Sequence, residues 1–323
     1  MKKGKVKHPV GSFLSLTVFI VSSSLFNPVF AQCQQDSLPV TLKILSWNIY
    51  MLPRPWLNTG QHERAIQIAE AIASEDADII VFEEAFDNHA RNAIREIIRD
   101  KFHYDSGKPG KNKWWKISSG IWIVSRLPFR VVDEIYFDHA AGPDRLACKG
   151  AVLIESEKEG FKFQVAGTHL QSSLAKKDIR SLQLTQYSQI HDELLQPYQK
   201  KGVPQFIAGD FNTEQSDTCS YQAMLAVMNA CDSRLEGNQR FSFDFSRNDF
   251  LAMHASRSQL IDYVLVRPNG NPGIISSATI KRFARKWCAA REDLSDHFAV
   301  AASVSLYLPV VTAGYKSNNL TIR

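Results

Sequence analysis

The stretch Gln205-Phe206-Ile207-Ala208-Gly209-Asp210-Phe211-Asn212 gives the first indication of the fold. Its mostly apolar first half predicts a short buried strand, and the polar side chains of Asp210 and Asn212 follow where that strand ends. In α/β proteins the loops at strand ends converge into a cleft. The stretch therefore predicts a strand of an α/β fold that delivers a carboxylate and an amide to a functional edge.

Polar motifs also occur at the ends of other predicted strands. These are Ser46-Trp47-Asn48, Glu83-Glu84, Gly167-Thr168-His169, Ile261-Asp262-Tyr263 and Ser295-Asp296-His297. Each motif alone has an ordinary explanation, such as a helix cap or a turn residue. Together they predict an oxygen-rich cage suited to a hard cation such as Mg²⁺. Because side chains alternate along a strand, Glu83 is expected to face away from Glu84 and from the cage.

Strands outnumber helices in the rest of the chain. The helical patterns cover residues 62–74, 90–102, 177–195 and 221–229. Strand-like runs occur at 42–47, 78–82, 121–125, 131–137, 151–155, 161–167, 205–208, 261–266 and 297–306. The hairpin-like middle disfavours a doubly wound parallel sheet. The pattern predicts an α/β (α+β) protein, a four-layer α/β/β/α sandwich of two mixed sheets flanked by helices.

The N-terminus has the features of a secretory signal peptide. Four lysines precede an apolar run over 10–25, and Val29-Phe30-Ala31 offers a cleavage site. The alternative, a membrane anchor, is disfavoured because Ser22-Ser23-Ser24 and Pro28 interrupt the run. We therefore expect secretion to the extracellular space after cleavage near Ala31. A single catalytic domain over 32–310 and a C-terminal tail over 311–323 are expected to follow.

The charge of the processed chain restricts its partners. The formal net charge of +5 includes four lysines of residues 1–31, a segment without Arg, Asp or Glu, so the processed chain carries +1 (5 − 4). A nearly neutral protein is poorly suited to tracking a nucleic acid, which is a polyanion. No nucleic-acid partner is expected, and the protein is expected to act as a monomer.

The ordered set of motifs resembles the endonuclease/exonuclease/phosphatase superfamily over about residues 41–306. That superfamily includes pancreatic deoxyribonuclease, abasic-site nucleases, inositol polyphosphate phosphatases and neutral sphingomyelinases. The resemblance implies a deoxyribonuclease-like fold and hydrolysis of a phosphate ester with Mg²⁺, for which Mn²⁺ or Co²⁺ is expected to substitute. Its branch of secreted bacterial sphingomyelinases, considered below, implies a bacterial source.

The resemblance also implies roles for the residues at the strand ends. Glu84 would ligate the metal, with Asn48 in or beside its coordination shell. His297 would be the general base, oriented by either Asp296 or Asp262. The remaining roles concern water and phosphate: Asp210 and Asn212 would position both, and His169 would donate a hydrogen bond to a non-bridging oxygen.

Within the superfamily, the run Gly142-Pro143-Asp144-Arg145-Leu146 followed by Lys149-Gly150 is similar to secreted bacterial sphingomyelinases. The implied activity is hydrolysis of sphingomyelin to ceramide and phosphocholine at a bilayer surface. One alternative is a secreted nuclease or phosphoinositide phosphatase. Another is a non-catalytic membrane-binding module, which the presence of Glu84, Asp210 and His297 disfavours.

Aromatic residues in predicted loops suggest how such an enzyme would meet a membrane. They are Trp56, Trp114, Trp115, Phe283 and Trp287, the last two interleaved with basic residues just before Ser295. Aromatic rings suit the headgroup level of a bilayer. The alternative for each ring is burial in the core, because large aromatic side chains are usually at least partly buried.

Overall fold

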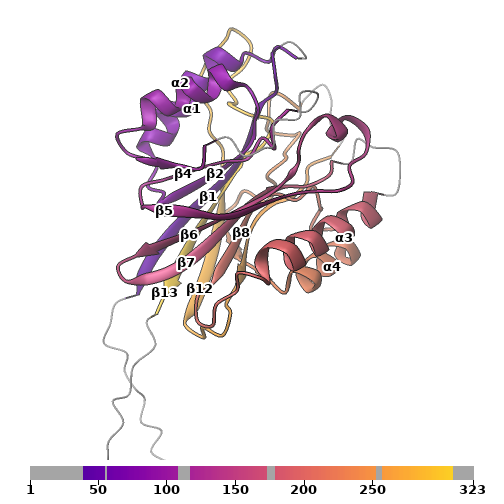
Figure 1. The fold of residues 1–323 in the computed structure, drawn as a ribbon. Helices are drawn as coiled ribbons and strands as arrows, with labels where there is room; N and C mark the ends of the chain where they lie inside the picture. The colour runs from indigo at the N-terminus through magenta and orange to yellow at the C-terminus, as the bar shows by residue number, and fades with distance from the viewer. Residues whose placement is uncertain (1–38, 55–56, 108–116, 173–178, 252–256, 308–323) are drawn as a thin grey trace, which may run out of the picture. The chain divides into compact units, whose positions relative to one another are not determined.

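Two mixed β-sheets pack face to face, with a pair of helices on the outer side of each (Figure 1). The computed structural model describes residues 39–54, 57–107, 117–172, 179–251 and 257–307. The expected signal peptide, the tail over 311–323 and the residues Trp56, Trp114 and Trp115 lie outside the described residues.

The first sheet is built around a long central strand, β1. Its strands, in spatial order, are β10 (Arg234–Glu236), β12 (Ile274–Lys281), β13 (Ala299–Leu306), β1 (Val40–Met51), β2 (Ile79–Ala85), β4 (Trp122–Ser125) and β3 (Tyr104–Asp105). Strand β1 runs parallel to β2 and antiparallel to β13. Alternation places Leu42 and Ile44 in the core that includes the space between the sheets, and Leu45 and Trp47 in the core under the helices.

Helices α1 (Gln61–Ser74) and α2 (Asn88–Ile98) cover the outer face of this sheet. The predicted apolar stripe of α1, which includes Ala65, Ile68 and Ile72, is fully buried against it. Asp87 caps α2 by accepting a hydrogen bond from the backbone N–H of Ala90 at 2.9 Å. Burial of these stripes fixes the helices to the sheet.

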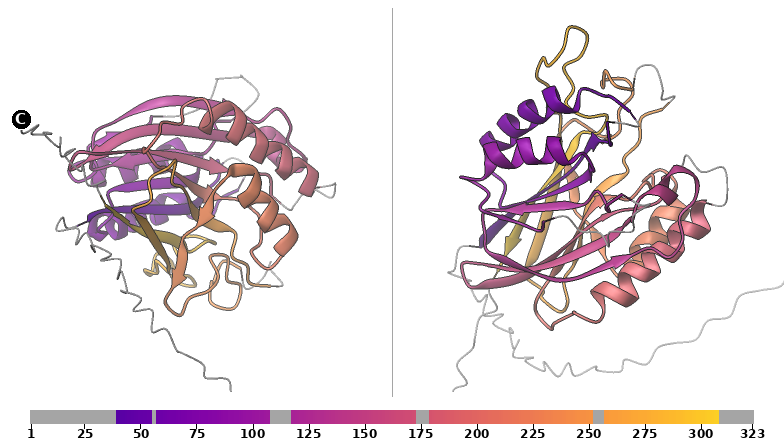
Figure 2. Two further views of the ribbon diagram at one scale, coloured as in Figure 1. Left: turned by 90° about the horizontal axis from the view of Figure 1, so that it is seen from below. Right: turned by 45° about the horizontal axis from the view of Figure 1, so that its top comes forward.

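The second sheet consists of β5 (Phe129–Tyr136), β6 (Gly150–Lys158), β7 (Phe161–His169), β8 (Gln205–Asp210), β11 (Asp262–Arg267) and β9 (Cys231–Asp232), in that order. Helix α3 (Ile179–Gln189), which continues as a π-helical segment over Ile190–Leu195, and helix α4 (Thr218–Met228) cover its outer face. Figure 2 shows the two helix pairs on opposite sides of the two sheets.

This arrangement confirms the predicted four-layer sandwich of two mixed sheets. One long strand was not predicted. Strand β12 has the sequence Ile-Ile-Ser-Ser-Ala-Thr-Ile-Lys, and its small polar residues weaken the hydrophobic signal of a strand. Within the described ranges, no helix combines the length and apolar character needed to cross a bilayer.

Candidate active site

Strand register brings the predicted polar residues together at one edge of the sandwich. Strand β7 pairs in parallel with β8, so His169 lies beside Asp210. Strand β11 starts at the same edge and runs antiparallel to β8, which places Asp262 on the other side of Asp210. Three residues separated by up to 93 positions therefore become neighbours through backbone pairing alone.

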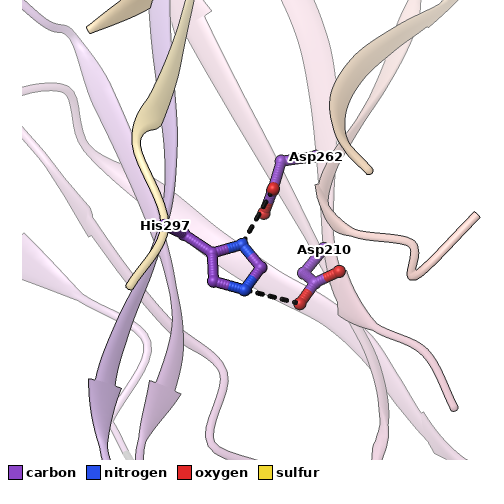
Figure 3. A group of neighbouring side chains, drawn as sticks. All are labelled: Asp210, Asp262 and His297. Carbon is purple, nitrogen blue, oxygen red and sulfur yellow. Dashed lines mark hydrogen bonds and ion pairs between the residues drawn. The ribbon is translucent and has the colours of Figure 1, made fainter. Parts of the chain in front are cut away.

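His297 reaches this row from the other sheet, just before β13, and lies between two carboxylates (Figure 3). Its Nδ1 is 2.9 Å from Asp262 Oδ2, and its Nε2 is 3.9 Å from Asp210 Oδ2. The three side chains are buried and have ligand atoms close enough to surround a metal ion. A hard cation prefers oxygen ligands, however, and a hydrogen bond between a carboxylate and an imidazole Nδ1 is also the arrangement found in hydrolase triads.

The electrostatic surroundings of His297 favour its protonated form. Burial lowers the pKa of the imidazole, but the charges of Asp262 and Asp210 outweigh that effect and hold the pKa well above its usual value. The two carboxylates therefore stabilise the imidazolium form, which is the state that His297 has after it accepts a proton. The Phe243 ring lies edge-on to the imidazole, with the ring centroids 5.0 Å apart.

The sequence left open whether Asp296 or Asp262 orients the imidazole, and the hydrogen bond in the structure is made by Asp262. Asp296 accepts a hydrogen bond from the Ser295 hydroxyl at 3.2 Å. Its charge is the largest contribution, after burial, to the raised pKa of Glu84. Asp296 and Glu84 therefore form one pair of interacting acids, which we call the acidic side of the site.

The expectation that Glu83 faces away from the site is wrong. Glu83 shares the inter-sheet face with Val81, and its carboxylate accepts a hydrogen bond from the Ser46 hydroxyl at 2.8 Å. Burial raises the pKa of Glu83 well above its ordinary range, and the charge of Asp262 raises it further. Glu84 has a φ of 54°. This left-handed turn breaks the alternation, so both side chains reach the polar edge.

Glu84 has the surroundings expected of a metal ligand. Its Oε2 atom is buried and has no hydrogen-bond partner among the described residues. Burial, followed by the charge of Asp296, raises the pKa of Glu84 to about 7. Burial and the charge of Asp262 likewise raise the pKa of Asp210 to about 6. A cluster of buried carboxylates with an unsatisfied oxygen fits a divalent cation, which would offset their mutual repulsion.

Two asparagines hold Asp210 in place. Asn48 donates from its side-chain amide to Asp210 Oδ2 at 3.1 Å, and the backbone N–H of Asn212 donates to Oδ1 at 2.9 Å. Asn212 also donates from Nδ2 to the carbonyl of Leu170 at 3.2 Å. Both asparagines predicted for the site therefore contact the central carboxylate, Asn48 through its side chain and Asn212 through its backbone.

Lys149 is a residue of the site whose role the sequence did not reveal. Its Nζ lies 3.0 Å from His169 Nε2 and 3.0 Å from Asp144 Oδ1, and it donates to the carbonyl of Leu170 at 2.8 Å. An ammonium group can only donate, so His169 Nε2 accepts. Burial, Lys149 and His297 hold the pKa of His169 well below its usual value, and the ring is neutral. The sequence run from Gly142 to Gly150 contains Lys149 and indicated the family resemblance, but it did not indicate what this lysine does.

The aromatic segment before His297 is packed against the protein. The Phe283 ring lies 4.7 Å from the ring of Trp47. Trp287 stacks on Phe250 with 5.8 Å between centroids, and its indole N–H donates to the carbonyl of Asp293 at 2.8 Å. For Phe283 and Trp287 the core alternative therefore holds.

Known proteins are similar to this chain in sequence and in fold. Sphingomyelinase C 2 from Leptospira interrogans serogroup Icterohaemorrhagiae serovar Lai is 27% identical over an alignment of 292 residues, and the match covers 82% of this chain and 46% of that protein. Sphingomyelinase C from Bacillus cereus is 26% identical over an alignment of 302 residues, and the match covers 82% of this chain and 89% of that protein. The chain thus spans about half the length of the Leptospira relative and most of the Bacillus one.

Solved structures give the same result for the fold. A beta toxin mutant from Staphylococcus aureus with bound magnesium ions superimposes with a TM-score of 0.73 at 25% identity, covering 81% of this chain and 99% of the toxin. Sphingomyelinase C from Streptomyces griseocarneus gives a TM-score of 0.71 at 24% identity over 82% of this chain and 99% of that one. The model of the Endonuclease/Exonuclease/phosphatase family matches residues 45–297, which include every strand-end motif described above. The chain belongs to the endonuclease/exonuclease/phosphatase family.

Proposed function

We propose that this protein is a secreted, Mg²⁺-dependent phosphodiesterase that hydrolyses sphingomyelin to ceramide and phosphocholine. The observation that carries the proposal is the buried His297–Asp262 pair, which faces Asp210 beside the carboxylates of Glu84 and Asp296. The similarity to proteins named sphingomyelinase C supports the choice of substrate.

The acidic side of the site would hold the cation. Glu84 would be its ligand, with Asn48 in or beside the coordination shell, and Mn²⁺ or Co²⁺ would substitute for Mg²⁺. The bound cation would neutralise negative charge on the phosphate as the transition state forms. The buried, unpartnered oxygen of Glu84 supports this assignment.

His297 would be the general base that takes a proton from the attacking water, which enters in line with the leaving oxygen. Its Nδ1 is held by Asp262, so Nε2 is directed toward Asp210 and is the atom that would receive the proton. Asp262 would stabilise the resulting imidazolium. Asp210 and Asn212 would position the water and the phosphate.

Lys149 and His169 would act on a non-bridging phosphate oxygen. Lys149 contacts His169 Nε2, and its positive charge partly offsets the rise that burial causes in the pKa values of Glu84 and Asp210. A buried cation at this position would stabilise the additional charge that the phosphate carries in the transition state. His169 would hold Lys149 in place through Nε2, which accepts from the ammonium group. For His169 itself to donate to the oxygen from Nε2, Lys149 would have to release that atom and the ring proton would have to move from Nδ1 to Nε2.

The test is phosphocholine release from sphingomyelin vesicles, measured with Mg²⁺ and with EDTA, with His297→Ala as the control. We expect Mg²⁺-dependent release that falls by about 10²–10⁴-fold in the variant, the range typical of a lost general base. Equal release by the variant would contradict the assignment of the base. Cleavage of plasmid DNA or phosphoinositides in place of sphingomyelin would assign the same chemistry to another substrate.

A further inference from the structure

We infer that the loop Arg240–Arg247, which lies between β10 and β11, docks on the phospholipid surface of a bilayer and orients the catalytic edge toward it. The inference rests on the proposed function and specifies how the site meets its substrate. We call this segment the docking loop.

The docking loop is attached directly to the catalytic residues. The hydroxyl of Ser242 accepts hydrogen bonds from the backbone N–H groups of Ile261, at 3.2 Å, and Asp262, at 3.3 Å. The carbonyl of Ser242 accepts from the backbone N–H of Phe298 at 2.7 Å. Ser242 is thus bound next to both members of the catalytic pair, while the adjacent Phe243 ring touches His297. A bilayer bound by this loop would therefore lie next to the general base.

The loop is held in one shape by the buried carboxylate of Asp244. This group accepts hydrogen bonds from Gln239 Nε2 at 2.9 Å, and from the hydroxyls of Ser246 and Ser258, both at 2.7 Å. With Ser242 and Asp244 turned inward, Phe241 and Phe245 are left 41% and 37% exposed. A fixed loop presents these two rings without the entropy cost of ordering a flexible one.

The charge around these rings fits a lipid phosphate. Arg240 and Arg247 are exposed at the two ends of the loop, and Arg247 donates to Gln239 at 2.9 Å. Aromatic rings flanked by arginines suit the interface of a bilayer, where the rings enter the headgroup layer and the guanidinium groups meet phosphates.

Two further exposed apolar side chains lie near strand ends of the same edge. Leu57 follows β1 and is 42% exposed, and Leu146 precedes β6 and is 48% exposed. Strand β1 ends at this edge, and β6 begins here beside the end of β7. By contrast, three basic residues of the segment 281–287 pair with acids of the protein: Lys281 with Glu75, Arg282 with Asp293 and Arg285 with Glu70.

The test compares Phe241→Ala/Phe245→Ala with the wild-type protein in co-sedimentation with vesicles of sphingomyelin and phosphatidylcholine. The assay is run in EDTA, so binding is measured without turnover. We expect the vesicle-bound fraction to require about tenfold more lipid in the variant, because two interfacial rings are lost. The matched control is Ile97→Ala/Leu184→Ala, which removes side chains of similar exposure from α2 and α3, and it should bind as wild type does.

Unchanged vesicle binding by the double alanine variant would overturn the inference. Phe241→Trp/Phe245→Trp should retain binding, and loss of binding in a tryptophan variant that melts normally would also overturn it. With Mg²⁺ present, the ratio of turnover on vesicles to turnover on monomeric hexanoyl sphingomyelin should fall about tenfold in the alanine variant. If the wild-type protein binds vesicles in EDTA but hydrolyses neither lipid with Mg²⁺, the proposed function is wrong and the docking surface is still supported.

Discussion

Asp262 and Asp296 differ in function although both are acids at the same edge of the sandwich, Asp262 buried and Asp296 half-buried. Asp262 forms the hydrogen bond to the imidazole and raises its pKa. We predict that Asp262→Asn lowers kcat by about 10²–10⁴-fold, since the imidazolium loses its stabilising charge. Removal of that charge also lowers the pKa of His297, so the ascending limb of the pH–rate profile should move to lower pH. A profile with an unchanged limb would count against Asp262 as the orienting group.

The adjacent acids Glu83 and Glu84 offer a matched pair of isosteric changes. Glu84→Gln should raise the Mg²⁺ concentration needed for half-maximal activity by about tenfold or more, because a charged ligand becomes a neutral amide. Glu83 is buried, its pKa is raised well above the usual range, and it is bonded to Ser46. Glu83→Gln should therefore shift the Mg²⁺ titration less than about twofold. Equal shifts for the two variants would remove Glu84 from the proposed ligand set.

At the scale of elements, one buried side chain of α1 connects the two strand ends that carry Asn48 and His297. Arg64 donates at 2.8 Å to the carbonyls of Ile49, at the end of β1, and of Leu294, before β13. It also donates to the carbonyl of Tyr50 at 2.6 Å. Burial lowers the pKa of Arg64 to about 10, which still leaves it charged at neutral pH. Helix α1 therefore fixes the geometry of the site from outside it.

We predict that Arg64→Met lowers the free energy of unfolding by about 3 kcal/mol, because several buried carbonyls lose their donor. Urea denaturation measures this as a lower midpoint with an unchanged slope. Arg99→Met is the control, since Arg99 and its partner Glu96 are more than half exposed. It should change stability by less than about 0.5 kcal/mol. A loss of similar size in the two variants would contradict the bridging role of Arg64.

For the whole molecule, the acids Glu84 and Asp210 are expected to make the free energy of unfolding depend on pH and on the concentration of a bound cation. The pKa values of Glu84 and Asp210 are raised to about 7 and about 6, so between pH 4 and 7 the folded protein binds more protons than the unfolded chain does. Metal-free stability should therefore fall as the pH rises through that window. Glu155 acts in the opposite sense, because hydrogen bonds from Lys200, Gln164 and Arg130 outweigh the effect of burial and lower its pKa to about 2. Its contribution is present above about pH 4.5 and is lost as the pH falls toward 2.

We predict that Mg²⁺ raises the melting temperature by several degrees at pH 7.5 and by less at pH 5, because protons and the cation compete for the same carboxylates. Differential scanning fluorimetry with EDTA as the reference measures both shifts. Glu84→Gln should reduce the shift at pH 7.5. A Mg²⁺ effect that is the same at the two pH values would argue against binding at these carboxylates.

The layered architecture and the polar residues at the strand ends can be predicted from the sequence. Hydrophobic runs that end near Asn48 or at Asp210, or that begin at Asp262, are local signals, because the periodicity of a strand and the polarity of its terminal residue are encoded in consecutive positions. For the same reason β12 was missed, since its alternating pattern is carried by small serines and a threonine.

Which of these residues are in contact depends on the tertiary structure. Only strand register shows that Asp262 and not Asp296 lies against His297. Only the left-handed backbone at Glu84 brings Glu83 and Glu84 to the same edge. Packing likewise left Phe283 and Trp287 half-buried against the core under the helices and Phe241 and Phe245 exposed. The physical reason is common to all of these cases: contacts between distant segments depend on pairing, backbone conformation and burial, which no local pattern of residues encodes.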